Sequence, residues 1–312
     1  MNFFRLLTPI NLDEEREKFF SSKNYNPTLK YIWSEENVTD WSEMYSKTIP
    51  LKEAILARDH KRIVQEAKLL FETELDEKLL NYSKEIIKNK PEVNNNQGLN
   101  EIVDGFEDAL DKFGIDYKIS ITDSEGYNIR PIHEKNEIHI SKNPSQQFFK
   151  TKDILKHEML HIVRSENSKY NNIPKSKNYL PTEEGFASFV QDYDSEIPTS
   201  SLFQHAAEYA VTEIALNGSL RNAVDYLINI GFSEDNAWKR GIRHKYGFID
   251  TSLPGDIMKP SMYFYNAEKI KALSKKEQLR LFVGKISFKD LPDYPEYKGK
   301  FSTNEINEYF LS

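Results

Sequence analysis

The sequence predicts an α+β protein that is dominated by helices and carries one small sheet. Between residues 55 and 79, apolar residues recur every three or four positions with Lys and Glu between them, which is typical of amphipathic helices. Two short segments, YKISIT (117–122) and EIHIS (137–141), instead alternate apolar and polar residues, as half-buried strands do. Helical patterns resume at Thr151 and continue almost to the end of the chain. Because the strand patterns are confined to the region just before residue 150, we expect a small sheet.

The length of 312 residues suggests about two domains. The segment KPEVNNNQGLN (90–100) interrupts the helical pattern with Pro91, three asparagines and Gly98, and it is typical of a linker or surface loop. We therefore expect an N-terminal helical region at residues 1–90 and a second domain at residues 98–312.

The composition is that of a globular protein, with 38% hydrophobic and 29% charged residues. The chain has no cysteine, which excludes disulfides and thiolate chemistry and fits a reducing compartment. Its first 20 residues lack the basic flank and the long apolar centre of a secretory signal. No segment approaches the ~18 uncharged apolar residues that a membrane span needs. We expect a cytoplasmic protein with no membrane partner.

The formal net charge of −7 argues against nucleic acid as a partner. Proteins that bind a duplex usually carry an excess of basic residues, because neutralising phosphates drives their affinity. Between Lys259 and Lys300 there are ten Lys and Arg against five Asp and Glu, which we interpret as a solvated face.

The segment TKDILKHEMLHIVRSEN (151–167) contains the pattern His-Glu-x-x-His. On a helix, His157 and His161 lie one above the other, so both imidazoles can bind one ion. Glu158 lies about 100° further round the helix, where it can take a proton from a metal-activated water without binding the metal itself. The expected number of chance matches to this pattern in a chain of this composition is on the order of one in seventy. The alternative to a metal site is that His157 and His161 are two core histidines that happen to lie four residues apart. The preceding segment EIHIS (137–141) is expected to be an edge strand beside this helix, where it would pair with an extended substrate.

A catalytic zinc ion (Zn²⁺) needs three protein ligands and one open position, so a third ligand must follow the two histidines. The segment PTEEGFASFVQDY (181–193) predicts a helix that Thr182 caps and whose first turn contains Glu183 and Glu184. Glu184 follows His161 by 23 residues, which suits a turn, a return loop and a second helix. Spacing alone does not choose between the two glutamates. The alternative is that the acidic pair only complements the helix dipole.

HEMLHIVRSEN (157–167), followed by LPTEEGFA (180–187), resembles the zinc metallopeptidase family typified by the microtubule-associated tyrosine carboxypeptidases. Bacterial relatives of that family are described by a "QEGLA" motif. Weaker similarities fall in the expected order along most of the chain: PINLDEEREKFFSSKNYNPTLKY (9–31), KRG (239–241), KPSMYFYN (259–266) and LFVGKIS (281–287). The chain departs from the family pattern in having two residues between the histidines instead of three.

The resemblance implies a zincin-like metallopeptidase core with Zn²⁺ as its cofactor. It implies that His157, His161 and Glu184 are the zinc ligands and that Glu158 is the general base. It selects Glu184 over Glu183, because Glu184 is the glutamate that precedes the Gly-Phe-Ala segment.

The resemblance also supplies candidates for substrate contacts. Arg164, Arg240 and Lys259 match polar positions of the family and are candidates for holding a substrate carboxylate. Tyr263 is a candidate catalytic residue that would donate a hydrogen bond to the developing oxyanion. Arginine is the better bidentate partner for a carboxylate.

These observations predict a zinc carboxypeptidase that removes a C-terminal residue, tyrosine or another aromatic one by analogy with the family, from a protein or peptide. The first alternative is a zinc endopeptidase with the same ligands and an open cleft. The second is a zinc-binding interaction module without turnover. The presence of Glu158 argues against the second, because a module that only holds zinc has no use for a base at that position.

Overall fold

The computed structural model describes residues 7–32, 48–91, 98–123, 129–142, 151–193 and 199–311. The chain divides into two compact units, the first made of residues 1–88 and 204–265 and the second of residues 89–203 and 266–312. Residues 204–265 thus group with the N-terminal part of the chain in the first unit. The reason is a shared apolar core, in which Ile63 and Phe71 pack in one cluster with Phe248 and Met258.

The described part of the first unit is helical. Its helices are α2 (Leu12–Ser21), α4 (Thr48–Leu56), α5 (His60–Phe71), α6 (Glu77–Lys88), most of α10 (Ser200–Asn217), α11 (Leu220–Asn229), α12 (Glu234–His244) and the start of α13 (Met262–Lys271). Local sequence signals set several of their ends. Asp59 accepts a hydrogen bond from the Arg62 backbone N–H at the start of α5, and Ser219 forms a capping box with Asn222 at the start of α11.

The second unit combines helices with a small sheet. Its elements are α7 (Leu99–Phe113), β1 (Lys118–Thr122), β2 (Ile129–Ile132), β3 (Glu137–Ser141), α8 (Thr151–Tyr170), α9 (Tyr179–Asp192), α14 (Lys275–Arg280), the 3₁₀ turns η1 (Leu281–Val283) and η2 (Phe288–Asp293), and α15 (Thr303–Phe310). The described residues thus form the helix-dominated α+β structure that the sequence predicts. None of the helices within the described ranges has both the length and the apolar character needed to cross a membrane.

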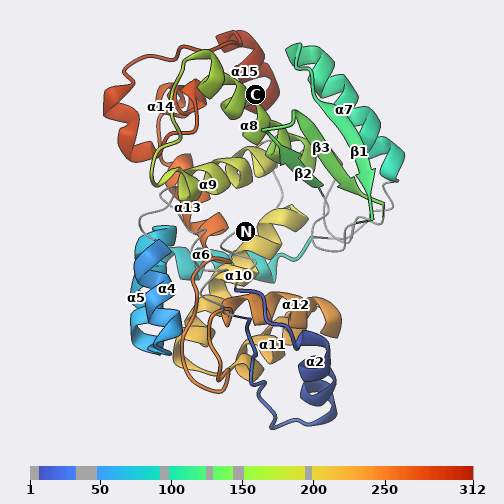
Figure 1. The fold of residues 1–312 in the computed structure, drawn as a ribbon, viewed down its shortest axis with the longest axis vertical. Coiled ribbons are helices and arrows are strands. Elements are labelled where there is room, and N and C mark those ends of the chain that lie inside the picture. The colour runs from blue at the N-terminus through green and yellow to red at the C-terminus, as the bar shows by residue number, and fades with distance from the viewer. Residues whose placement is uncertain are drawn as a thin grey trace. The chain divides into compact units, whose positions relative to one another are not determined.

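The described strands form a mixed sheet in the order β1-β3-β2 (Figure 1). β1 runs parallel to β3, and β2 runs antiparallel to it with Arg130 opposite His139. The expectation that EIHIS (137–141) forms an edge strand is wrong, because β3 is paired on both sides. The strand that the sequence analysis missed, β2, is only four residues long and contains Pro131, and proline is found in sheets mainly on edge strands.

The sheet and α7 hold α8 in place. Ile138 and Ile140 of β3 are fully buried in one apolar cluster with Phe106 of α7 and with Leu160 of α8. Figure 1 shows α7 lying along the sheet. A Cβ at Gly105 would lie 2.5 Å from a methyl carbon of Leu155, so glycine leaves room for the Leu155 side chain where α7 packs against α8. The helix that carries the His-Glu-x-x-His pattern is thus packed firmly into the core of the second unit.

Candidate metal centre

α8 and α9 bring the three predicted zinc ligands together. His157 and His161 lie one turn apart on α8, with ring centroids separated by 5.1 Å. Glu184 projects from α9, and its Oε2 lies 3.9 Å from His157 Nε2 and 4.0 Å from His161 Nε2. Among the described residues, these three form the group whose donor atoms, all within 4.8 Å of one another, are spaced to hold a metal ion.

The donor set and its spacing fit zinc. Two imidazole nitrogens and one carboxylate oxygen are a ligand set of catalytic zinc sites, which keep a fourth position for water. Around a tetrahedral zinc with bonds of about 2.0–2.1 Å, donor atoms lie roughly 3.3–3.5 Å apart. The observed separations of 3.9 and 4.0 Å exceed this by about half an ångström. The donor atoms, all within 4.8 Å of one another, would therefore have to move slightly closer together to bind zinc.

Each of the two histidines also makes a polar contact through Nδ1, the ring nitrogen that does not face Glu184. Nδ1 of His157 lies 3.0 Å from Oε1 of Gln191, and Nδ1 of His161 lies 2.8 Å from Oε1 of Glu183. Because an amide or carboxylate oxygen only accepts hydrogen bonds, each neutral ring carries its proton on Nδ1. The lone pair of each Nε2 then lies on the side of the ring that faces Glu184. Such outer partners commonly orient histidine ligands and fix their tautomer.

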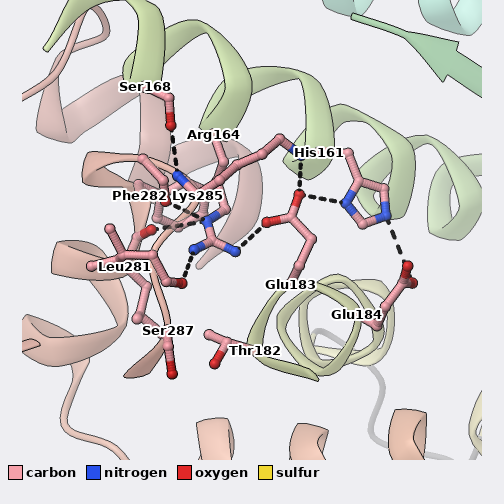
Figure 2. A network of polar contacts seen from close by, with 12 residues as sticks. His161, Arg164, Ser168, Thr182, Glu183, Glu184, Leu281, Phe282, Lys285 and Ser287 are labelled. Carbon is pink, nitrogen blue, oxygen red and sulfur yellow. Dashed lines mark hydrogen bonds and ion pairs between the residues drawn. The ribbon is translucent and has the colours of Figure 1, made fainter. Parts of the chain in front are cut away.

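Glu183 and Glu184 extend in different directions from α9, with His161 between them (Figure 2). Glu184 faces Nε2 of both histidines, whereas Glu183 is 3% exposed and faces the protein interior. Its carboxylate accepts hydrogen bonds from Arg164 and, at 2.5 Å, from Nζ of Lys285. The sequence spacing left the choice between the two glutamates open, and only Glu184 lies where a shared metal ligand must lie. The sequence analysis did not predict that Glu183 would contact His161 behind the metal ligands. Its position in the acidic pair was the only feature of the sequence that pointed to it.

The buried charges shift the pKa values of this group. Burial by itself would raise the pKa of Glu183, but Lys285, Arg164 and the hydrogen bond to His161 outweigh it and hold this pKa well below its usual range. Burial also opposes charge on His161, yet the hydrogen bond to Glu183 and the surrounding carboxylates raise the pKa of this imidazole. Glu183 is therefore an anion in the folded protein.

Glu158 lies next to the ligands without being one of them. It follows His157 directly on α8 and is partly exposed. Burial by the surrounding protein raises the pKa of Glu158 to about 7, with Glu184 adding to the shift while His161 and Lys285 oppose it. A carboxylate with a pKa near neutrality is suited to accept and return a proton, and a bound metal ion would lower this pKa.

Arg164 is placed differently from the expectation. Its side chain is fully buried, and besides Glu183 it donates to the backbone carbonyls of Leu281, Gly284 and Ile286. The guanidinium thus binds groups of the protein itself. This favours a role in holding Glu183 over the expected contact with a substrate carboxylate.

The other predicted substrate residues belong to the first unit. Arg240 donates to Glu208, with a separation of 2.7 Å, and Tyr263 stacks on His205 with ring centroids 5.4 Å apart. Lys259 precedes α13 in the same unit. Arg240, Lys259 and Tyr263 thus belong to the first unit and the candidate zinc ligands to the second, and the roles of these three residues stay predictions.

The start of α9 also differs from the expectation. The helix begins at Tyr179, so Thr182 lies within it and does not cap it. The Thr182 hydroxyl instead accepts a hydrogen bond from the backbone N–H of Phe288. A Cβ at Gly185 would lie 2.5 Å from Cβ of Asn266, so the glycine after Glu184 permits a close approach to this residue. These contacts fix the turn of α9 that carries Glu183 and Glu184.

One more histidine lies near this site without a sequence signal. His133 follows β2, and its Nδ1 lies 3.3 Å from the hydroxyl of Tyr117. Burial, together with the charges of Lys285 and His161, lowers the pKa of His133 to about 2, so the ring is neutral. His139 of β3 contacts Glu137 on the same strand, with Nε2 lying 2.8 Å from a carboxylate oxygen.

Comparisons with known proteins add no relative. No protein-family model matches the chain, and a search of curated protein sequences finds no match either. The family resemblance therefore stays a prediction, and the geometry of the site carries the functional argument.

Proposed function

We propose that this protein is a zinc-dependent metallopeptidase. The observation that carries the proposal is the convergence of His157, His161 and Glu184 around one point, with Glu158 adjacent on the same helix. A purely structural zinc site is usually closed by four protein ligands, whereas three ligands beside a carboxylate are typical of a hydrolytic site.

In this mechanism zinc would supply a Lewis acid that lowers the pKa of water towards ~7 and polarises the scissile carbonyl. The residues of the chain provide the rest. Gln191 and Glu183 accept hydrogen bonds from Nδ1 of the two imidazoles, so that Nε2 of each ring carries the lone pair that would bind the metal. The Glu158 carboxylate accepts a proton from the attacking water and returns it to the leaving amine nitrogen.

Among metallopeptidase activities we favour a carboxypeptidase that acts on the C-terminal tail of a protein or peptide. This preference rests on the family resemblance and on the cationic residues Arg240 and Lys259. An endopeptidase with the same ligands is the alternative. We also propose a cytoplasmic location, based on the absence of cysteine from the sequence.

The test is to incubate the zinc-loaded protein with a mixed pool of free-acid and C-terminally amidated peptides and to identify the products by mass spectrometry. Loss of single C-terminal residues from the free acids alone is expected for a carboxypeptidase. Internal cleavage of both kinds of peptide would establish the endopeptidase instead.

The matched control is Glu158→Gln, which keeps the size of the side chain but removes the base. We expect it to retain zinc and to lose hydrolysis by about 10²–10⁴-fold, the usual contribution of a general base. Zinc content is measured on the same samples. Hydrolysis that persists unchanged in Glu158→Gln, or a wild-type protein that binds no zinc, would refute the proposal.

A further inference from the structure

We infer that Glu183 is a positioning residue of the metal centre, and that Arg164 and Lys285 hold its carboxylate against His161. This inference rests on the proposed zinc site and extends it to a segment far away in the sequence. Lys285 lies 102 residues beyond Glu183, and neither residue is needed as a ligand in the proposed reaction.

The contacts around Glu183 use both of its carboxylate oxygens. Oε1 accepts from Nδ1 of His161 at 2.8 Å and from Nζ of Lys285 at 2.5 Å, and Oε2 accepts from Nη1 of Arg164. All three donors approach from outside α9, so the carboxylate has little freedom to rotate away from the imidazole. The side chains of Glu183, Lys285 and Arg164 are 3%, 4% and 0% exposed. Buried charge-assisted hydrogen bonds of this kind are short, and they impose a defined geometry.

The two cations are themselves fixed by the chain between residues 281 and 287. Arg164 donates to the carbonyl oxygens of Leu281, Gly284 and Ile286, so this segment wraps around its guanidinium (Figure 2). The backbone N–H of Lys285 donates to the hydroxyl of Ser168 on α8 at 2.7 Å. A Cβ at Gly284 would lie 2.7 Å from the same hydroxyl, so the close approach depends on glycine. The 281–287 segment is thereby bound to α8, and it places the ammonium group of Lys285 next to Glu183.

The consequence for the metal centre follows from the hydrogen bond between Glu183 and Nδ1 of His161, which fixes the orientation of the ring. A carboxylate fixed at Nδ1 keeps the ring proton on that nitrogen and makes Nε2 the more basic donor. Without it, the imidazole could exchange its proton between the two nitrogens or rotate, and one of the three ligands would be lost for part of the time. His157 has a neutral amide, Gln191, in the equivalent position. His161 is therefore the ligand whose orientation depends on the charged network.

The first test measures zinc affinity by competition with a chelator for the wild type, Glu183→Gln and a matched control, Glu166→Gln. Glu166, like Glu183, contacts two cationic side chains, here Lys169 at 2.8 Å and Lys300 at 3.2 Å, and it lies on α8 beyond the two histidines. We expect Glu183→Gln to weaken zinc binding about 10–100-fold, the usual effect of removing such an outer partner. Glu166→Gln is expected to bind zinc as the wild type does.

The second test reads the His161 tautomer directly in the zinc-free protein. At a pH above the raised pKa of His161, long-range ¹H–¹⁵N spectra of protein labelled at histidine are expected to show the proton of the neutral His161 ring on Nδ1 in the wild type and in Glu166→Gln. A mixture of tautomers is expected in Glu183→Gln, because the amide that replaces the carboxylate can face Nδ1 with its donating nitrogen as well as with its oxygen. A role limited to stabilising the fold would leave this signature unchanged.

The outcomes separate the inference from the proposed function. If the wild type binds zinc but Glu183→Gln binds it as tightly as Glu166→Gln does, the positioning role is refuted while the zinc site stands. If the wild type binds no zinc, the proposed function fails, and the tautomer measurement still decides the role of Glu183. Should Glu183→Gln not fold, the double variant Glu183→Gln with Lys285→Met, which removes one charge of each sign, replaces it in both measurements.

Discussion

Glu183 in the second unit and Glu208 in the first are both buried carboxylates held by two cationic side chains. Glu183 contacts Arg164 and Lys285, and Glu208 contacts Arg240 at 2.7 Å and Arg243 at 3.0 Å. Burial would raise the pKa of each carboxylate, and the paired cations outweigh it and lower the pKa in both cases. The ionic clusters are thus similar in composition and in electrostatics.

The two clusters differ in what the nearby histidine does. His161 is hydrogen-bonded to Glu183 through Nδ1 and turns Nε2 towards Glu184 and His157. His205, near Glu208, instead stacks on Tyr263 at an interplanar angle of 13°. A buried glutamate with two cations therefore does not make a metal centre. The centre requires that the second nitrogen of the histidine meet other ligands, and the spacing of His157, His161 and Glu184 provides this.

The largest expected difference between the clusters is in stability. Arg164→Met leaves Glu183 with one buried cation and removes the donor to three backbone carbonyls, so we expect a loss of roughly 3–5 kcal/mol in the free energy of unfolding. Arg240→Met should cost less, roughly 1–3 kcal/mol, because the Arg240 side chain is 17% exposed and Arg243 stays paired with Glu208. Urea unfolding of the zinc-free proteins measures both values. Equal losses would contradict the view that the Glu183 cluster is the more tightly constrained of the two.

A smaller effect is expected on zinc affinity from the two buried glutamines. Gln191 holds Nδ1 of His157, whereas Gln204 accepts a hydrogen bond from Arg240 in the Glu208 cluster. Gln191→Leu should weaken zinc binding by about tenfold, at the lower end for such partners because the amide is uncharged. Gln204→Leu removes a buried amide of the same size and should leave zinc affinity unchanged. The same chelator competition measures the zinc affinity of both variants. Equal affinities of Gln191→Leu and Gln204→Leu would show that Gln191 does not contribute to zinc binding.

The smallest expected effect is a pH dependence of stability that arises from His205. Burial, with the charges of Arg240 and Arg243 adding to it and Glu208 opposing it, lowers the pKa of His205 from 6.5 to about 4. Between these values the unfolded chain binds more protons than the folded one, so this residue makes stability fall as the pH decreases from 6.5 to 4. In His205→Gln, urea unfolding over this range should depend less on pH than in the wild type. An identical dependence would show that the imidazole is not held neutral by the fold.

Local patterns predicted the parts of the site that lie close together in the chain. The spacing of His157 and His161 places both rings on one face of a helix, because the helical repeat alone determines this. The helical region before residue 90, β1 and β3 were also recognisable from short-range periodicity. The strand β2 was missed because four residues with a proline give too short an alternating pattern.

The helix-dominated α+β class, the His-Glu-x-x-His helix and the acidic pair that follows it can therefore be read from the amino-acid sequence. The fold is needed to see that Glu184 faces both histidines while Glu183 faces Arg164 and Lys285, and that residues 204–265 group with the N-terminal helices. The physical reason is that helical periodicity depends on neighbours three or four residues apart. The direction of a buried side chain depends on partners that the fold brings from as far as 102 residues away.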